Sequence, residues 1–309
     1  MSLLLARLGA DKALRFWQKC KSLSRLQKGL VMKKVASTLV SAVMPRRRML
    51  AWLATGAVAA ATVGAAAATS GAAETPALDV PGALEGGAAA NLRQLTAALA
   101  AAPRRRDFKT VPMILDHPRQ WDSAALELLL HYRGGPKQVW DNTDIASPWL
   151  NLMRNAMNAQ VWSYRQPDFL AVSATHGTCH LALFDEVMWD KYDFPAMIKN
   201  QFKRNIFLTV PPAVRGKNAG DFNDPHGLFS PAANCIPLLV ERGAVFLACH
   251  NMIWEFSHAF IAKGHNPDHL NHERLAADLT NHLIPGAILT PGIVATIPLL
   301  EAAGYRYIK

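Results

Sequence analysis

The chain has 309 residues, half of them hydrophobic and 18% of them charged, and its formal net charge is +10 at pH 7. That positive charge lies at the N-terminus: residues 1–73 hold 12 Lys and Arg against one acidic residue, and the other 236 residues hold 21 basic and 22 acidic ones. A near-neutral domain lacks the basic surface that follows phosphates, which excludes nucleic acid as its partner.

Residues 44–73 have the three parts of an export signal. Arg46, Arg47 and Arg48 form a positive region, an apolar run covers residues 50–68, and small residues suited to signal peptidase follow. This arrangement resembles the twin-arginine consensus, although Met49 stands where Phe is commonest. Because the apolar run is mostly Ala, Gly and Thr, it inserts weakly into a bilayer. We predict export to the periplasm by the twin-arginine pathway, with membrane contact only during export; an uncleaved membrane anchor is the alternative.

The rest of the chain divides around this signal. Residues 1–43 are a basic extension, which is either a mis-assigned start, with translation beginning at Met44, or a true extended n-region. Residues 74–105 are rich in Ala, Gly and Pro and predict a linker with a short helix at 91–101. Residues 106–309 are then expected to form one domain.

Within this domain, short apolar segments alternate with segments of helical periodicity. The alternation predicts an α/β fold with a mainly parallel sheet and helices on both faces. A polar turn is expected at 141–144, with Ser147 capping the helix after it, and a long surface loop at 211–230. The predicted strands are 137–140, 169–172, 244–249, 287–289 and 305–308; the predicted helices are 122–131, 147–164, 181–192, 230–242, 253–263, 271–283 and 293–303.

Polar or conformationally special residues follow four of the predicted strands. In parallel sheets the carboxyl ends of the strands share one edge, and ligands collect beyond it. We therefore predict a ligand pocket at this edge. Its residues, in strand order, are Asp141 and Asn142, His176 and Gly177, Cys249 with His250 and Asn251, and Pro291 and Gly292.

The order of these motifs resembles the DsrE-like proteins of sulfur metabolism. The shared features are an Asn-rich helix, a strand ending in His-Gly, a strand ending in Cys-x-Asn, a Gly-containing turn, and a Gly-Tyr-x-Tyr-Ile ending. Here they read as residues 150–156, 172–177, 243–251, 292–294 and 304–308, so the resemblance covers about 135–309. It implies a small α/β fold that forms homo-oligomers and a strand-end cysteine that carries sulfur as a persulfide; that cysteine corresponds to Cys249. The export signal, an insertion at 193–230 and the extra N-terminal helix depart from the cytoplasmic members.

Cys249 is the predicted nucleophile. A thiol between a strand and a helix can be exposed and acidified by backbone N–H groups and by a neighbouring His250. His176 is the second predicted catalytic residue, as an acid/base or a hydrogen-bond partner of the thiol. The partner would be a small sulfur species or a protein thiol. The alternatives are a buried, inert cysteine and a non-catalytic module that binds a small ligand or a metal.

The remaining histidines and cysteines give weaker signals. His176 and His180 would share one face of a helix and are weak metal candidates. The histidines after Cys249 indicate a scattered polar surface, and Cys179 could pair with Cys235 in a disulfide. The chain has no P-loop, GxGxxG, GxSxG or CxxC motif, which argues against nucleotide-driven and thioredoxin-like chemistry. No cofactor is predicted.

Overall fold

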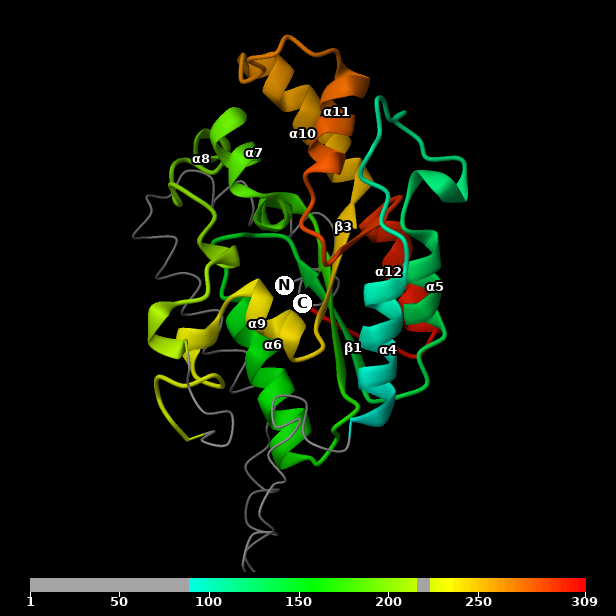
Figure 1. The fold of residues 1–309 in the computed structure, drawn as a ribbon, viewed down its shortest axis with the longest axis vertical. Helices are drawn as coiled ribbons and strands as arrows, with labels where there is room; N and C mark the ends of the chain where they lie inside the picture. The colour runs from blue at the N-terminus through cyan, green and yellow to red at the C-terminus, as the bar shows by residue number, and fades with distance from the viewer. Residues whose placement is uncertain (1–88, 216–222) are drawn as a thin grey trace, which may run out of the picture. The chain divides into compact units, whose positions relative to one another are not determined.

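A computed structural model of the chain describes residues 89–215 and 223–309. The predicted signal, the extension before it and residues 74–88 of the linker lie outside these residues. The described part is an α/β domain around a five-stranded sheet in which every pair of neighbouring strands is parallel, in the order β4-β3-β2-β1-β5 (Figure 1). The strands are β1 (Lys137–Asn142), β2 (Leu170–Thr175), β3 (Val245–Cys249), β4 (Ala287–Thr290) and β5 (Arg306–Ile308). The predicted fold class is confirmed.

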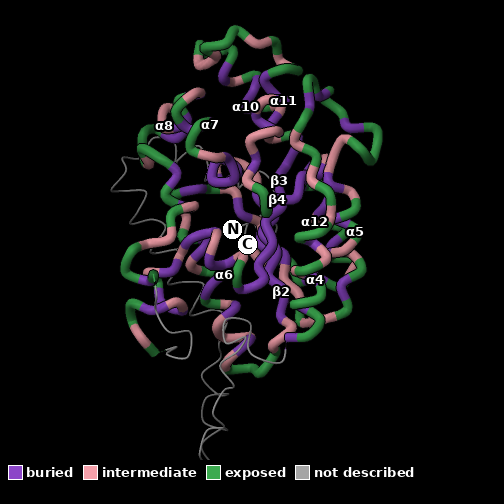
Figure 2. The backbone as a smooth tube through the Cα atoms, viewed as in Figure 1, coloured by how far each residue is buried: buried purple, intermediate pink, exposed green. Residues whose placement is uncertain are grey.

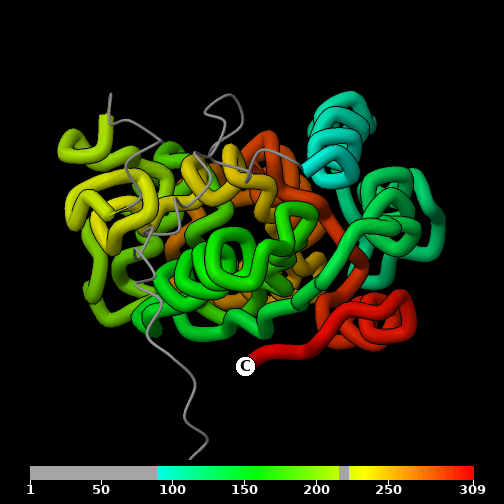
Figure 3. The backbone as a smooth tube through the Cα atoms, turned by 90° about the horizontal axis from the view of Figure 1, so that it is seen from below, coloured from blue at the N-terminus to red at the C-terminus, as the bar shows by residue number. Residues whose placement is uncertain are grey.

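Helices cover both faces of the sheet, and Figure 3 shows α4, α5 and α12 gathered on one side of it. We call this side the α12 face and the opposite side, which carries α6, α9, α10 and α11, the α10 face. The longer helices are α4 (Ala90–Ala101), α5 (Ser123–Leu130), α6 (Trp149–Asn158), α7 (Glu186–Lys191), α9 (Ile236–Glu241), α10 (His250–Lys263), α11 (His272–Asn281) and α12 (Ile293–Ala302).

The central strands are buried on both faces, as Figure 2 shows, because each face packs against helices. Successive side chains alternate between the faces. In β3, Leu247 and Cys249 point to the α12 face, and Phe246 and Ala248 point to the α10 face. The position of a site residue along its strand therefore decides on which face of the sheet its side chain lies.

The direction of the chain connections explains the two layers. The connections from β1 to β2, β3 and β4 step across the sheet in one direction, and their helices pack on the α10 face. From β4 the chain returns to the far edge, beside β1, and α12 lies on the opposite face. Because crossovers between parallel strands are right-handed, reversing the direction moves the helix to the other face.

An ion pair between buried Asp122 and half-buried Arg106 covers the β4 edge of the sheet. The backbone N–H of Asp122 donates to the Leu289 carbonyl at 3.0 Å, and Leu289 N–H donates to Asp122 Oδ2 at 2.7 Å. Arg106 pairs with this carboxylate at 2.9 Å and also donates to the Ala287 carbonyl at 3.2 Å. The segment before α5 thus satisfies backbone groups that an edge strand would otherwise leave open to another chain.

Several elements differ from the prediction in their bounds. Asp141 and Asn142 belong to β1 rather than to a turn, because they pair with Ala174 and Thr175 of β2. Ser147 does not cap α6; its hydroxyl donates to the Asp144 carbonyl instead.

The helices differ in similar ways. The expected helix at 181–192 is a 3-10 helix, η4 (Gly177–Leu183), followed by α7, and the helix expected at 230–242 begins only at α9. The helix α4, placed in the linker by the sequence, packs Leu92, Leu95 and Leu99 on the α12 face.

Asp122→Ala is expected to lower the free energy of unfolding by about 3–5 kcal/mol, because it leaves the largely buried Arg106 side chain, 16% exposed, without its carboxylate and frees the β4 edge. The matched control is Asp107→Ala, which removes an exposed pair with Arg105 at 2.7 Å and should change the free energy by less than about 0.5 kcal/mol. Urea titrations of both variants measure the difference. Equal effects of the two substitutions would contradict this account of the edge.

Candidate functional site

The predicted site residues lie along the carboxyl edge of the sheet. Their strands are parallel, so Asp141 in β1, His176 after β2, Cys249 at the end of β3 and Gly292 after β4 all lie at the same edge. They form two groups. One group surrounds the sulfur of Cys249 between β3 and β4, and the other surrounds the carboxylate of Asp141 between β5, β1 and β2.

The sulfur lies where the chain leaves neighbouring strands in opposite directions. After β3 the chain enters α10 on one face, and after β4 it enters α12 on the other. In open α/β sheets this divergence forms the crevice in which ligands bind.

Two helix N-termini converge on Cys249. Its Sγ accepts the backbone N–H of Ile293, the first residue of α12, at 3.4 Å. The backbone N–H groups of Asn251 and Met252, in the first turn of α10, also lower the pKa of the thiol. The positive ends of both helices therefore face one side chain, an arrangement that favours negative charge on it.

Burial opposes this effect. Cys249 is only 5% exposed, and this burial raises the pKa of its thiol despite the lowering by the hydrogen bonds from Ile293, Met252 and Asn251. The expectation of an exposed, acidified thiol is therefore wrong for this conformation: removing water from the sulfur outweighs the three N–H groups.

His250 does not assist the thiol here. Its Nε2 donates to the carbonyl of Pro112 at 2.8 Å and lies 3.2 Å from that of Met113, so the ring anchors the segment that precedes α5. Burial lowers the pKa of His250, which keeps the ring neutral. Adjacency to Cys249 in the sequence suggested a catalytic role, but the helix directs this side chain elsewhere.

Asp141 is the centre of the second group. Its Oδ1 lies 2.6 Å from His176 Nε2, and its Oδ2 accepts the Tyr307 hydroxyl at 2.6 Å, with Lys309 Nζ at 3.7 Å. Burial alone would raise the pKa of Asp141, but the hydrogen bonds from Tyr307 and His176 and the charges of His176 and Lys309 bring it below its ordinary value. The same bond to Asp141 raises the pKa of Tyr307 to about 12. The carboxylate is thus ionised and accepts from both neighbours.

Tyr307 and Lys309 were not predicted as site residues. Tyr307 lies in the C-terminal strand and Lys309 follows it, and this strand pairs with β1 rather than with β4. The Gly-Tyr-x-Tyr-Ile ending was the only signal of their position, and it does not indicate which strand they adjoin.

Asn142 and Gly177 shape the edge. Asn142 is buried on the α10 face, where its amide donates to Ser173 Oγ at 2.8 Å and to Met153 Sδ at 3.4 Å. Gly177 has φ +54°, and a Cβ there would lie 2.4 Å from the Thr143 carbonyl oxygen. Only glycine allows the two loops to approach this closely.

Asn251, Pro291 and Gly292 lie beside the sulfur. A Cβ on Gly292 would lie 2.7 Å from Asn251 Nδ2, so the Asn251 amide packs directly on this glycine. Asn251 is exposed and Pro291 is half-buried. These residues form the rim next to Cys249.

The side chain of His180 lies in the hydrophobic core, apart from that of His176. In the 3-10 helix η4, residues four apart are a third of a turn apart, so the two imidazoles do not share a face. His180 is fully buried against Phe184 and Phe256, and neither ring nitrogen has a hydrogen-bond partner. Burial lowers its pKa to about 3.

Among the described residues, no three His, Cys, Asp or Glu side chains are grouped as a metal site requires.

The other two cysteines in the described part of the chain are Cys179 and Cys235. Cys179 and Cys235 are buried free thiols rather than a disulfide, and burial raises the pKa of each.

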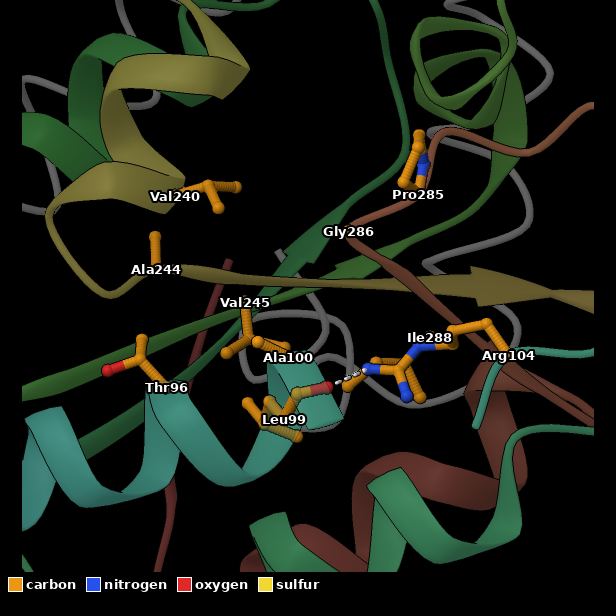
Figure 4. A pocket seen from close by; sticks show the side chains of 10 residues that line it. All are labelled: Thr96, Leu99, Ala100, Arg104, Val240, Ala244, Val245, Pro285, Gly286 and Ile288. Atoms are coloured by element: carbon orange, nitrogen blue, oxygen red, sulfur yellow. Dashed lines mark hydrogen bonds between the residues drawn. The ribbon is translucent and has the colours of Figure 1, made fainter. Parts of the chain in front are cut away.

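A pocket of about 180 Å³ lies at the opposite edge of the sheet, between α4 and α9 (Figure 4). Thr96 and Leu99 of α4 face Val240 and Ala244 across it. Arg104, which also lines it, donates to the carbonyls of Leu99 and Ala287 and to others nearby. Arg104 is the one charged residue among those that line the pocket, and its guanidinium donates to backbone carbonyls, so the pocket offers mainly apolar surface. The pocket lies at the edge of the sheet opposite to the predicted site residues. A shallower pocket of about 420 Å³ is lined by Pro103, Arg105 and Trp121, among others.

Comparisons with known protein families, with characterised proteins and with solved structures find no match for this chain. The structure thus establishes an α/β domain with a five-stranded parallel sheet. In residues 89–215 and 223–309, no helix is both long enough and apolar enough to cross a membrane.

The burial of His180 predicts a pH-dependent stability. The unfolded chain binds a proton at this ring near its ordinary pKa of 6.5, whereas the folded chain binds it only near pH 3. Between these values the unfolded state holds more protons, so the free energy of unfolding falls as the pH falls, by up to about 1.4 kcal/mol per pH unit.

His180→Leu should remove this contribution, and its unfolding free energy should decline less steeply from pH 6.5 to 4 than that of the unchanged chain. Urea titrations at several pH values measure the slopes. The control is His131→Leu, at a ring 70% exposed, which should leave the slope unchanged. Parallel curves for the chain with and without His180 would contradict the prediction.

Proposed function

We propose that this protein is an exported, DsrE-like sulfur-handling protein in which Cys249 accepts and passes on a sulfur atom. The observation that carries the proposal is the convergence of α10 and α12 on Sγ, with the Ile293 N–H at 3.4 Å. Three backbone N–H groups suit a sulfur anion at this position, whether a thiolate or a persulfide. The ordered motifs that resemble the DsrE-like family support the same assignment.

The chemistry is a transfer of sulfane sulfur. The Cys249 thiolate attacks the outer sulfur of a donor such as thiosulfate or a small persulfide, and a new S–S bond forms. The S–S bond of the donor breaks, and sulfite or the donor thiolate leaves with the electron pair. Atoms and electrons balance without another oxidant. A second thiol, small or on a partner protein, then removes the sulfur.

The burial of Cys249 limits where this reaction starts. A thiol that is 5% exposed with a raised pKa is mostly protonated at neutral pH and meets a donor only when the rim opens. The rim consists of Asn251 on Gly292, at the divergence of the two helices. We propose that the rim opens before the Cys249 thiolate attacks the donor sulfur.

The export signal and the family resemblance complete the proposal. The twin-arginine-like segment supports a periplasmic location, and the resemblance supports a homo-oligomer. In an oxidising compartment the carrier needs a thiol partner to discharge it.

A non-catalytic module that binds a small ligand at the same edge is the second candidate. The burial and raised pKa of Cys249 favour it, since they describe an inert structural thiol. The two candidates differ in one respect: a binding module keeps its biological effect in Cys249→Ser, and a sulfur carrier loses it.

Incubation of the folded protein with thiosulfate or glutathione persulfide should add the mass of one sulfur atom at Cys249. Intact-mass and peptide mass spectrometry locate the adduct. Cys249→Ser should abolish it, and Cys235→Ser, at a buried thiol just before α9, should retain it. A folded protein whose Cys249 stays unmodified by both donors would refute sulfur transfer and leave the binding module.

A further inference from the structure

Three adjacent strands carry Asp141, His176 and Cys249 at or just beyond their carboxyl ends, and we call these three residues the row. Strand β2 lies between β1 and β3, and Thr175 of β2 is paired with Ala248 of β3. One residue further along both strands are His176 and Cys249. The His176 backbone is still extended, with φ −150° and ψ −166°, so the alternation of side chains continues to it.

The alternation places the row on one face. Ala174 and Leu247 are register partners and both point to the α12 face. Two residues on, His176 and Cys249 point to this face as well, on strands that lie about 4.8 Å apart. Asp141 comes from the other neighbour of β2 and contacts His176 at 2.6 Å. His176 therefore follows the strand that lies between the strand of the carboxylate and the strand of the thiol.

The hydrogen bonds select the tautomer of His176. Tyr307 donates to Asp141, whose carboxylate is ionised and can only accept. Nε2 of His176 must then carry the proton that it shares with Asp141, so that in the neutral ring Nδ1 is the nitrogen with the free lone pair. A base that a carboxylate orients, at the end of the strand next to that of a nucleophile, has the placement needed to activate a thiol in covalent catalysis.

We propose that Tyr307, Asp141 and His176 form a proton relay that controls the protonation of Cys249, with the C-terminal strand supplying its outer member. The inference rests on the proposed function and names residues that act through one another on the thiol. Nδ1 of His176 takes the Sγ proton as the donor enters; the S–H bond breaks and an N–H bond forms. The imidazolium pairs with Asp141, the thiolate attacks the donor sulfur, and the leaving group takes the proton from Nδ1.

Other charged groups act on this row. Lys309 lies 3.7 Å from Asp141, His180 couples electrostatically to His176 from the core, and Glu255 on α10 disfavours the thiolate. Tyr307 acts as a positioning residue, because it holds Asp141 in its ionised form without facing the sulfur. Its strand pairs with β1 over only three residues, so the relay depends on the last few residues of the chain.

The test is the rate of alkylation of Cys249 by iodoacetamide between pH 5 and 10, mapped by peptide mass spectrometry. His176→Gln should slow the reaction about tenfold or more near pH 7 and move the midpoint of its pH profile upward. Asp141→Asn should do the same to a smaller extent, and Tyr307→Phe should shift the midpoint least. All variants should converge at pH 10, where hydroxide deprotonates the thiol directly.

Tyr164→Phe is the control, at a tyrosine that is 66% exposed and outside the row. It should reproduce the profile of the unchanged chain. Convergence at high pH separates a lost proton relay from a damaged fold, which would alter the rate at every pH. If His176→Gln does not fold, Asp141→Asn and Tyr307→Phe decide the question.

The result that overturns the relay is an unchanged profile in Asp141→Asn and His176→Gln while Cys249 still reacts. This outcome is distinct from failure of the proposed function. A chain that shows the predicted alkylation profiles but gains no sulfur from thiosulfate or persulfide retains the relay and excludes the sulfur carrier.

Discussion

The reversal of the chain between β4 and β5 is the constraint on which the site depends. Right-handed crossovers require α12 to lie on the face opposite to α10, so the two helices begin on either side of the β3–β4 boundary. Their N-termini then point toward the same place. Cys249, the last residue of β3, occupies it, and its sulfur accepts an N–H from the first residue of α12. The same reversal places β5 beside β1 and supplies Tyr307 to Asp141.

Two opposing effects act on the sulfur. Helix N-termini and three backbone N–H groups favour an anion, and exclusion of water disfavours one more strongly. The balance yields a protonated thiol in the closed edge and a site prepared for charge once water or a substrate enters. A base in the neighbouring strand, oriented by a carboxylate, suits such a site because the proton must leave as the anion forms.

The sequence predicted the parallel sheet and the edge, because alternating apolar and periodic segments define both without any long-range information. It also placed Cys249 at a strand end. It did not predict the burial of that thiol or the direction of His250, since both depend on segments far away in the chain, the α12 N-terminus and Pro112. Tyr307 was missed for the same reason: no local pattern shows that the last strand adjoins the first.

The most direct test of the central claim is the order in which the three described cysteines of the folded protein react with a thiol reagent at pH 8. All three are buried, but only Cys249 lies at an edge where two helices begin. We predict that Cys249 is labelled first, with Cys179 and Cys235 protected until the protein unfolds. Labelling of all three together, only on unfolding, would contradict a functional thiol at this edge.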